Sequence, residues 1–139
     1  MIDLSFAEIA ARLQKISLPE VDLVVGIGRG GMVPAVLAGY RLGKEVTFLH
    51  LNYRDAQNQP CREQPALMSA FIPPEKGRRI LLVDDVSVSG QTLNTAKDLL
   101  ADYNIATFVL KGQADYVLFP EIKDCVNWPW KSLDPDAKG

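Results

Sequence analysis

Short apolar runs alternate with amphipathic stretches along this sequence, and the alternation limits the chain to few folds. Residues 21–28 (VDLVVGIG) and 78–85 (RRILLVDD) have the continuous apolar centres of strands that are buried on both faces. Apolar residues at helical spacing follow each of them, in 33–40 and in 92–102. Because a strand that leads into a helix is the repeating unit of a parallel sheet, the sequence predicts an α/β fold with a central parallel sheet flanked by helices.

The rest of the chain fits one domain that spans residues 1–139. An amphipathic helix is expected over 6–16, with Ser5 and Glu8 forming a capping box at its start. Further strands are predicted at 45–53, 66–72, 105–111 and 114–119. With 139 residues, of which 47% are apolar, the chain can build one core of ordinary size and has no room for a second domain.

Two segments of the sequence lack any periodicity. Residues 54–65 are polar and contain proline, which predicts a loop. Loops of this length in compact domains are usually functional or mobile, so we expect a flexible loop here. Residues 120–139 hold both tryptophans, side chains that are rarely left on a bare surface. We therefore expect this segment to form a small C-terminal hood that covers part of the molecule.

Charge and composition narrow the possible partners. Lys and Arg number 15 against 17 for Asp and Glu, so no global basic field indicates nucleic acid or an anionic membrane as partner. The sequence has neither an apolar run of membrane-spanning length nor a secretory signal, which favours a cytoplasmic protein. His50 is the only histidine and Cys61 and Cys125 are the only cysteines, which argues against a zinc site, a Ser-His triad or a disulfide framework. A small molecule or another protein remains as the natural partner.

The first candidate site is the glycine turn GIGRGG at 26–31. Gly26, Gly28 and Gly31 match the dinucleotide-binding pattern G-x-G-x-x-G between a predicted strand and a predicted helix. Against a dinucleotide, no acidic residue closes the second strand at the position that would bind the ribose. A tight turn without a ligand is a further alternative, because glycine is the default residue of such turns.

The second candidate site is the stretch VDDVSVSGQT at 83–92. Two adjacent carboxylates at a strand end, Asp84 and Asp85, are suited to bind vicinal hydroxyls directly or through a metal ion. The small hydroxylated residues 87–92 lead into a helix N-terminus, where backbone amides and the helix dipole bind a phosphate. Together these features predict a site for a ribose 5-phosphate. The alternative, a solvated acidic turn with a capping serine, explains the residues one by one but not their order.

At this point the sequence resembles a known family. Residues 80–92 (ILLVDDVSVSGQT) resemble the phosphoribosyl pyrophosphate (PRPP) signature of type I phosphoribosyltransferases. Residues 24–43 are similar to the pyrophosphate-binding loop and following helix of the xanthine-guanine members of that family, 110–119 to their lysine-bearing strand, and 126–130 to their Pro-Trp tail. The resemblance covers most of the chain and is weakest in the flexible loop.

The resemblance implies a PRPP site and its magnesium ion. The implied PRPP-binding residues are Arg29, Gly30, Asp84, Asp85, Val86, Ser87, Val88, Ser89, Gly90, Gln91 and Thr92. Asp84 and Asp85 would serve the ribose hydroxyls and Mg²⁺, and Arg29 would share the catalytic role with them. The Arg29–Gly30 peptide would bind pyrophosphate, and it is often cis in the family. Arg54 or Arg62 of the closing loop would reach the leaving pyrophosphate.

The resemblance also implies the second substrate and the reaction. Lys111, Val126 and Trp128, with the region from Trp128 to Trp130, would form part of the base pocket. Lys111 would donate to an exocyclic oxygen of a 6-oxopurine; simple solvation of Lys111 is the alternative. The expected activity is purine salvage: transfer of ribose 5-phosphate from PRPP to the base, with pyrophosphate released and a nucleoside monophosphate formed. Family analogy further suggests a homodimer.

Three departures from the family pattern leave two hypotheses open. Val88 stands where the 6-oxopurine enzymes usually have an Asp that exchanges a proton with the purine, Cys125 where a base-stacking Trp is expected, and Asn52-Tyr53 where a Ser-Tyr pair is expected. The first hypothesis is a phosphoribosyltransferase, which Arg29 and the acid pair favour. The second is a regulatory module that binds PRPP or a nucleotide with little catalysis, which Val88 favours.

Overall fold

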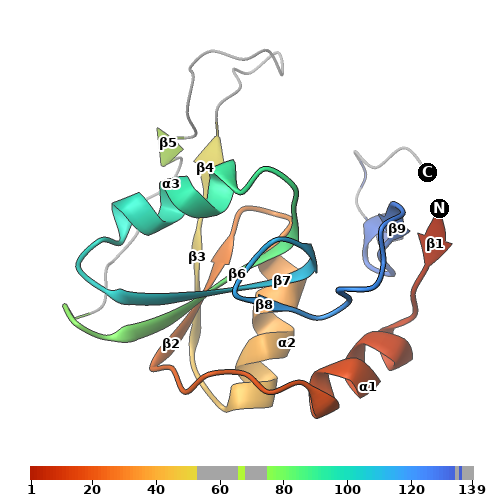
Figure 1. Ribbon diagram of the computed structural model, residues 1–139, viewed down its shortest axis with the longest axis horizontal. Helices are drawn as coiled ribbons and strands as arrows, with labels where there is room; N and C mark the ends of the chain where they lie inside the picture. The colour runs from red at the N-terminus through yellow and green to blue at the C-terminus, as the bar shows by residue number, and fades with distance from the viewer. Residues whose placement is uncertain (53–65, 68–74, 134, 136–139) are drawn as a thin grey trace.

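A five-stranded parallel sheet forms the centre of the molecule in the computed structural model, which describes residues 1–52, 66, 67, 75–133 and 135. Its strands are β2 (Leu23–Ile27), β3 (Val46–Leu49), β6 (Arg79–Ser87), β7 (Asn104–Gly112) and β8 (Tyr116–Val117). Their order across the sheet is β3-β2-β6-β7-β8, and every neighbouring pair is parallel (Figure 1). This arrangement confirms the α/β architecture expected from the alternating apolar runs.

Helices cover both faces of this sheet. The helices α1 (Phe6–Lys15) and α2 (Met32–Leu42) pack on one face, and α3 (Gln91–Leu99) packs on the other (Figure 1). Successive side chains of β6 point to opposite faces of the sheet. Leu81 and Val83 belong to the core cluster under α1 and α2, whereas Ile80 and Leu82 belong to the core cluster under α3. This two-sided burial explains why the apolar runs of the central strands are continuous.

The C-terminal segment forms a separate small structure beside the sheet. Strand β9 (Val126–Asn127) pairs in parallel with β1 (Ile2–Asp3), and a 3₁₀ helix, η1 (Lys131–Leu133), follows it (Figure 1). The hood predicted over 120–139 therefore joins the N-terminal end of the chain through main-chain pairing.

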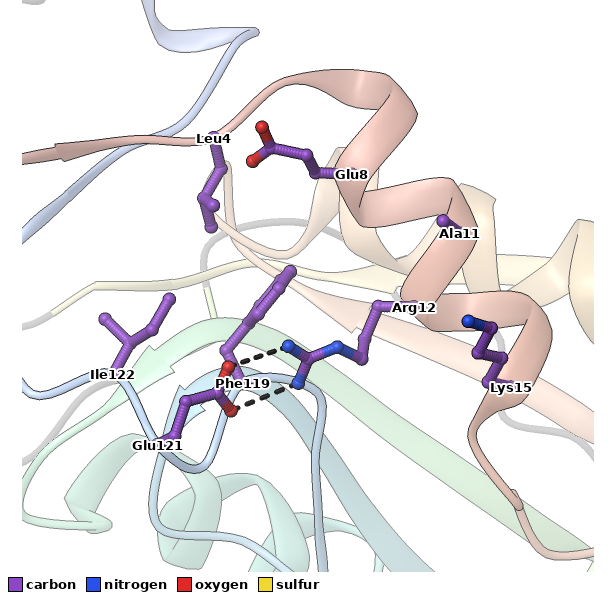
Figure 2. A pocket seen from close by; sticks show the side chains of 8 residues that line it. All are labelled: Leu4, Glu8, Ala11, Arg12, Lys15, Phe119, Glu121 and Ile122. Atoms are coloured by element: carbon purple, nitrogen blue, oxygen red, sulfur yellow. Dashed lines mark hydrogen bonds and ion pairs between the residues drawn. The ribbon is translucent and has the colours of Figure 1, made fainter.

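Helix α1 is fixed to the beginning of this hood by an arginine clamp. The helix is capped as predicted, with the amide of Glu8 donating to Oγ of Ser5 at 3.1 Å. Arg12 donates to both carboxylate oxygens of Glu121, at 3.1 and 2.7 Å (Figure 2). It also donates to the carbonyl of Leu118 at 2.8 Å. The Arg12 guanidinium also lies 4.6 Å from the ring centroid of Phe119. Four contacts of one side chain thus bind α1 to the segment after β8.

Several element boundaries differ from the sequence-based expectation. Strand β6 continues to Ser87, because its pairing with β7 extends through Val86 opposite Lys111 and Ser87 opposite Gly112. The acid pair, expected as the last two residues of the strand, is therefore followed by two further strand residues. The strand expected over 45–53 is divided at His50 into β3 and the short β4 (Leu51–Asn52), which pairs antiparallel with β5 (Ala66–Leu67).

The predicted flexible loop at 54–65, with Tyr53, lies outside the described residues. Within the part of the chain that the structure describes, no helix is both long and apolar enough to cross a membrane.

Candidate functional site

The two acidic residues of β6 are held by the backbone that carries them. The amide of Asp85 donates to Oδ1 of Asp84 at 2.8 Å, and the amide of Val86 donates to Oδ1 of Asp85 at 2.7 Å. Burial, followed by the charge of Asp85, raises the pKa of Asp84 to about 8. A negative charge on Asp84 is therefore costly here unless a cation lies close to it.

The glycine turn between β2 and α2 packs directly against this acid pair. The turn is closed by hydrogen bonds from the Gly28 amide to the Leu49 carbonyl at 2.8 Å and from the Gly31 amide to the Ile27 carbonyl at 2.9 Å. A Cβ placed on Gly30 would come within 2.7 Å of Oδ1 of Asp85. The Arg29–Gly30 peptide is trans, so the cis form expected from the resemblance is not present in this structure.

A second glycine turn joins the end of β6 to α3. Gly90 has a φ of 80°, in the region that favours glycine, and is the N-cap of the helix. Oγ of Ser89 accepts a hydrogen bond from the amide of Gln91 at 3.2 Å. Thr92 lies in the first turn of α3, while the side chain of Val88 is 80% exposed. The predicted phosphate loop therefore has the expected form, a strand end that leads through glycine to a helix N-terminus.

Lys111 reaches the same edge of the sheet from the neighbouring strand. It lies opposite Val86 in the β6–β7 pairing and is half-buried. Gly112 follows with a φ of 113°, and a Cβ there would overlap the Ser87 carbonyl. The close approach of these two strand ends holds Lys111 beside the acid pair and the phosphate loop.

The hood places Trp128, one of the predicted base-binding residues, in the core. Trp128 is 2% exposed and packs in the core cluster beneath α1 and α2, so neither of its ring faces is open to a base. Its ring stacks on that of Trp130, with centroids 5.7 Å apart and planes inclined by 2°. Val126 is half-buried and pairs with Ile2 at the edge of the hood. Burial therefore argues against direct contact between Trp128 and a base. Trp130 is the tryptophan that lines a cavity.

That cavity has a volume of about 350 Å³ and lies between the first glycine turn and the hood. Its lining residues are Arg29, Gly30, Met32, Val33, Trp130, Lys131 and Leu133. Nζ of Lys131 is 4.0 Å from Oδ2 of Asp85. Lys131 was not among the site residues predicted from the sequence.

A second cavity, of about 340 Å³, lies between α1 and the segment after β8 (Figure 2). The two cavities share no lining residue in the part of the chain that the structure describes. Arg12, one of its basic residues, is already engaged by Glu121 and the Leu118 carbonyl. The acid pair, both glycine turns and Lys111 are elsewhere, so the candidate functional site is at the carboxyl ends of β2, β6 and β7.

Comparison with known proteins identifies the family of the chain. A family model described as the phosphoribosyl transferase domain matches residues 2–135. A purine phosphoribosyltransferase from Pyrococcus horikoshii superposes with a TM-score of 0.72 at 22% identity, over 93% of this chain and 92% of that one. A hypothetical protein from Neisseria gonorrhoeae with bound ppGpp gives a TM-score of 0.72 at 25% identity, over 97% and 91% of the two chains.

A curated relative of a different kind also matches. The transcriptional regulator GfcR of Thermoplasma acidophilum is 34% identical over 74 residues, which are 53% of this chain and 33% of the regulator. The chain spans less than two thirds of the length of the curated relatives that it matches.

Proposed function

Because the chain belongs to the phosphoribosyl transferase domain family, we propose that it is a phosphoribosyltransferase that uses Mg²⁺ and PRPP. It transfers ribose 5-phosphate to a nucleobase, with a 6-oxopurine as the expected acceptor, and releases pyrophosphate. The observation that carries this proposal is the contact between Gly30 and Asp85. It supports the proposal because it brings the glycine turn at 26–31 and the acid pair of β6 together.

The acid pair fits the requirements of a magnesium ion. Mg²⁺ is usually bound by one or two carboxylates together with water and substrate phosphates, not by a cage of protein ligands. In the described part of the chain, no group of three or more His, Cys, Asp or Glu side chains is arranged to hold a metal. Asp84 and Asp85 would hold the ion jointly with PRPP, and the ion would supply positive charge to the departing pyrophosphate.

The two glycine turns bind the two phosphate ends of PRPP. Residues Val86 to Thr92 surround the 5-phosphate, with donors from the N-terminus of α3 and the hydroxyls of Ser89 and Thr92. Arg29 and the Gly30 amide bind the pyrophosphate on the other side of Asp85. With one phosphate group bound by each turn, the sugar is held between the turns and its C1 is exposed to the base.

The proposed reaction is a substitution at C1 of the ribose. The bond from C1 to the pyrophosphate oxygen breaks and its electron pair leaves with pyrophosphate, while a lone pair on a ring nitrogen of the base forms the new bond. The base loses a proton to solvent, because Val88 has no group that can accept it. Lys111 donates to the exocyclic oxygen of the base, and Arg29 stabilises the charge of the leaving group.

A second candidate function is supported by Val88 and by two of the similar proteins. A regulatory module that binds PRPP or a nucleotide needs the phosphate-binding turns but no proton acceptor at position 88. GfcR is a transcriptional regulator, and the Neisseria protein holds the nucleotide ppGpp. Binding of PRPP or ppGpp without turnover on any base would favour this function.

We propose that the protein acts in the cytoplasm as a single domain of residues 1–139 and as a homodimer. Helix α2 supports the dimer, because Met32, Val36 and Tyr40 are spaced by four residues along one side of it and are 43%, 39% and 86% exposed. A stripe of this kind on a helix is typical of a surface that another protein covers.

Calorimetric titration of PRPP in the presence of Mg²⁺ tests the proposed site. The wild type should bind PRPP, and Asp85→Asn should weaken binding at least tenfold, because a charge-assisted contact is lost. Equal affinity of the two proteins would refute the role of the acid pair.

A further inference from the structure

Lys131 is separated from Asp85 by 46 positions in the chain, yet it lies beside it in the fold. Its Nζ is 4.0 Å from Oδ2 of Asp85, whose side chain is 15% exposed. The fold therefore brings a basic residue of the hood close to the acid pair.

Lys131 lines the same cavity as Arg29. The cavity of about 350 Å³ has the first glycine turn as one wall and η1 with Trp130 as the other. Among the described residues that line it, Arg29 and Lys131 are the two basic ones and none is acidic. A cavity with one cation on each wall, open next to a proposed magnesium site, is suited to a compact polyanion.

The contact with Asp85 leaves the donors of Lys131 available for such a ligand. A separation of 4.0 Å is an ion pair but exceeds the length of a hydrogen bond. The Lys131 side chain is also 49% exposed, so its ammonium group can reach other acceptors.

The backbone of Lys131 is fixed even though its side chain is not. Its amide donates to the Trp128 carbonyl at 3.0 Å, and the Leu133 amide donates to the Trp130 carbonyl at 3.1 Å. The stack of Trp128 on Trp130 holds this turn on the core, and Phe6 of α1 contacts the Trp130 ring at a centroid distance of 5.7 Å. The buried tryptophan thus acts as the support of a residue at the site.

We propose that Lys131 binds the pyrophosphate group of PRPP together with Arg29, as a leaving-group residue that the hood supplies. The inference rests on the proposed function and adds a residue to it. Pyrophosphate carries several negative charges, and among the described lining residues Arg29 offers one positive charge. Lys131 supplies a second, and its ammonium group lies near Asp85.

Inorganic pyrophosphate and ribose 5-phosphate, each titrated with Mg²⁺ by calorimetry, separate the two halves of the site. Lys131→Met should weaken the binding of pyrophosphate and PRPP about tenfold and leave that of ribose 5-phosphate unchanged, because a single charged donor is lost on one side only. Lys131→Arg should restore most of the affinity. Lys123→Met is the matched control, since it removes the same charge from an exposed hood residue that lines neither cavity.

Two results would overturn the inference. One is that the Lys131→Met and Lys123→Met proteins have equal melting temperatures and bind pyrophosphate with equal affinity. The other is a Lys131→Met protein that binds Mg²⁺ more tightly and pyrophosphate unchanged, which would make Lys131 only a counter-ion of Asp85. Failure of the wild type itself to bind PRPP would instead contradict the proposed function.

Discussion

Gly30 and Asp85 touch across the site: a Cβ on residue 30 would lie 2.7 Å from Oδ1 and 3.0 Å from Oδ2 of the carboxylate. The contact joins the turn after β2 to the end of β6, two strands that are neighbours in the sheet. Position 30 therefore requires glycine because a side chain there would collide with the carboxylate of Asp85.

Gly30→Ala should disturb Asp85 before it disturbs the rest of the fold. The added methyl group must move the carboxylate, which the Val86 amide holds at 2.7 Å, or displace the turn. Overpacking of this kind typically costs about 1–3 kcal/mol of unfolding free energy. We expect that loss together with a fall in PRPP affinity of more than tenfold, measured by urea unfolding and calorimetry.

A double-mutant cycle identifies the cause. In an Asp85→Ala background, where the carboxylate is gone, Gly30→Ala should cost clearly less unfolding free energy than in the wild type. Equal costs in the two backgrounds would mean that the methyl group conflicts with something other than Asp85.

The raised pKa of Asp84 predicts the pH dependence of stability and of metal binding. Burial and the neighbouring Asp85 raise this pKa from 3.8 to about 8, so the folded protein binds the proton more tightly than the unfolded chain does. The stabilisation is complete below about pH 4 and is lost as the pH rises through about 8. Without Mg²⁺, the free energy of unfolding should therefore fall across this range, and Asp84→Asn should flatten the slope.

Mg²⁺ should reverse this trend, because the ion requires the ionised carboxylate. The affinity for Mg²⁺ in the presence of PRPP should rise from pH 6 to pH 9, as measured by calorimetry at each pH. The unfolding free energy and Mg²⁺ affinity could instead depend on pH in the same way in the wild type and in Asp84→Asn. That result would contradict the raised pKa of Asp84.

Val88→Asp tests whether position 88 limits the chemistry. The side chain is 80% exposed, so the substitution should leave the melting temperature within about 1 °C, as surface changes usually do. Restoring a general base should raise the rate of transfer to a 6-oxopurine by about 10²- to 10⁴-fold. Val88→Asn is the uncharged control of similar size, and equal rates for Asp and Asn would show that no proton acceptor is missing at this position.

The arginine clamp predicts a loss of stability in acid. Hydrogen bonds from Arg12 lower the pKa of Glu121 to about 2, so the contribution of this pair is present above about pH 4.5 and is lost as the pH falls toward 2. Glu121→Gln should reduce the melting temperature at pH 6 slightly and show a smaller further drop at pH 3 than the wild type. Because Glu121 is exposed, the difference should be modest. If the melting temperatures of the two proteins fell equally between pH 6 and pH 3, the ion pair of Arg12 and Glu121 would not contribute to the acid dependence of stability.

The apolar stripe of α2 predicts the oligomeric state. Tyr40→Glu places a charge in the proposed dimer surface and should shift the protein to a monomer in light scattering. Leu99→Glu changes an exposed apolar residue of α3, 53% accessible, and should leave the dimer intact. A wild type that is monomeric at all concentrations would contradict the proposed dimer. A Tyr40→Glu protein that remains dimeric would show that α2 does not form the interface.

The sequence was sufficient for the parts of this molecule that follow regular periods. Continuous apolar runs predicted the central strands because those strands are buried on both faces, and the order of acids and glycine in 83–92 predicted a phosphate loop. The end of β6 was misplaced by two residues, since its length depends on pairing with β7 that no local pattern reveals.

The hood was predicted only in outline, because irregular segments carry no periodicity that assigns their side chains to a face. Trp128 and Trp130 are two positions apart and chemically alike, yet one is core and the other lines the site. The proximity of Lys131 to Asp85 arises from long-range packing of η1 and has no signal in the residues near either one.

Whether the protein is a transferase is decided by measuring pyrophosphate release from PRPP and Mg²⁺ with hypoxanthine, guanine, xanthine, adenine, uracil or orotate. We expect release that depends on a 6-oxopurine and is abolished by Asp85→Asn. Tight binding of PRPP or a nucleotide with no release on any of these bases would contradict it and favour the regulatory module.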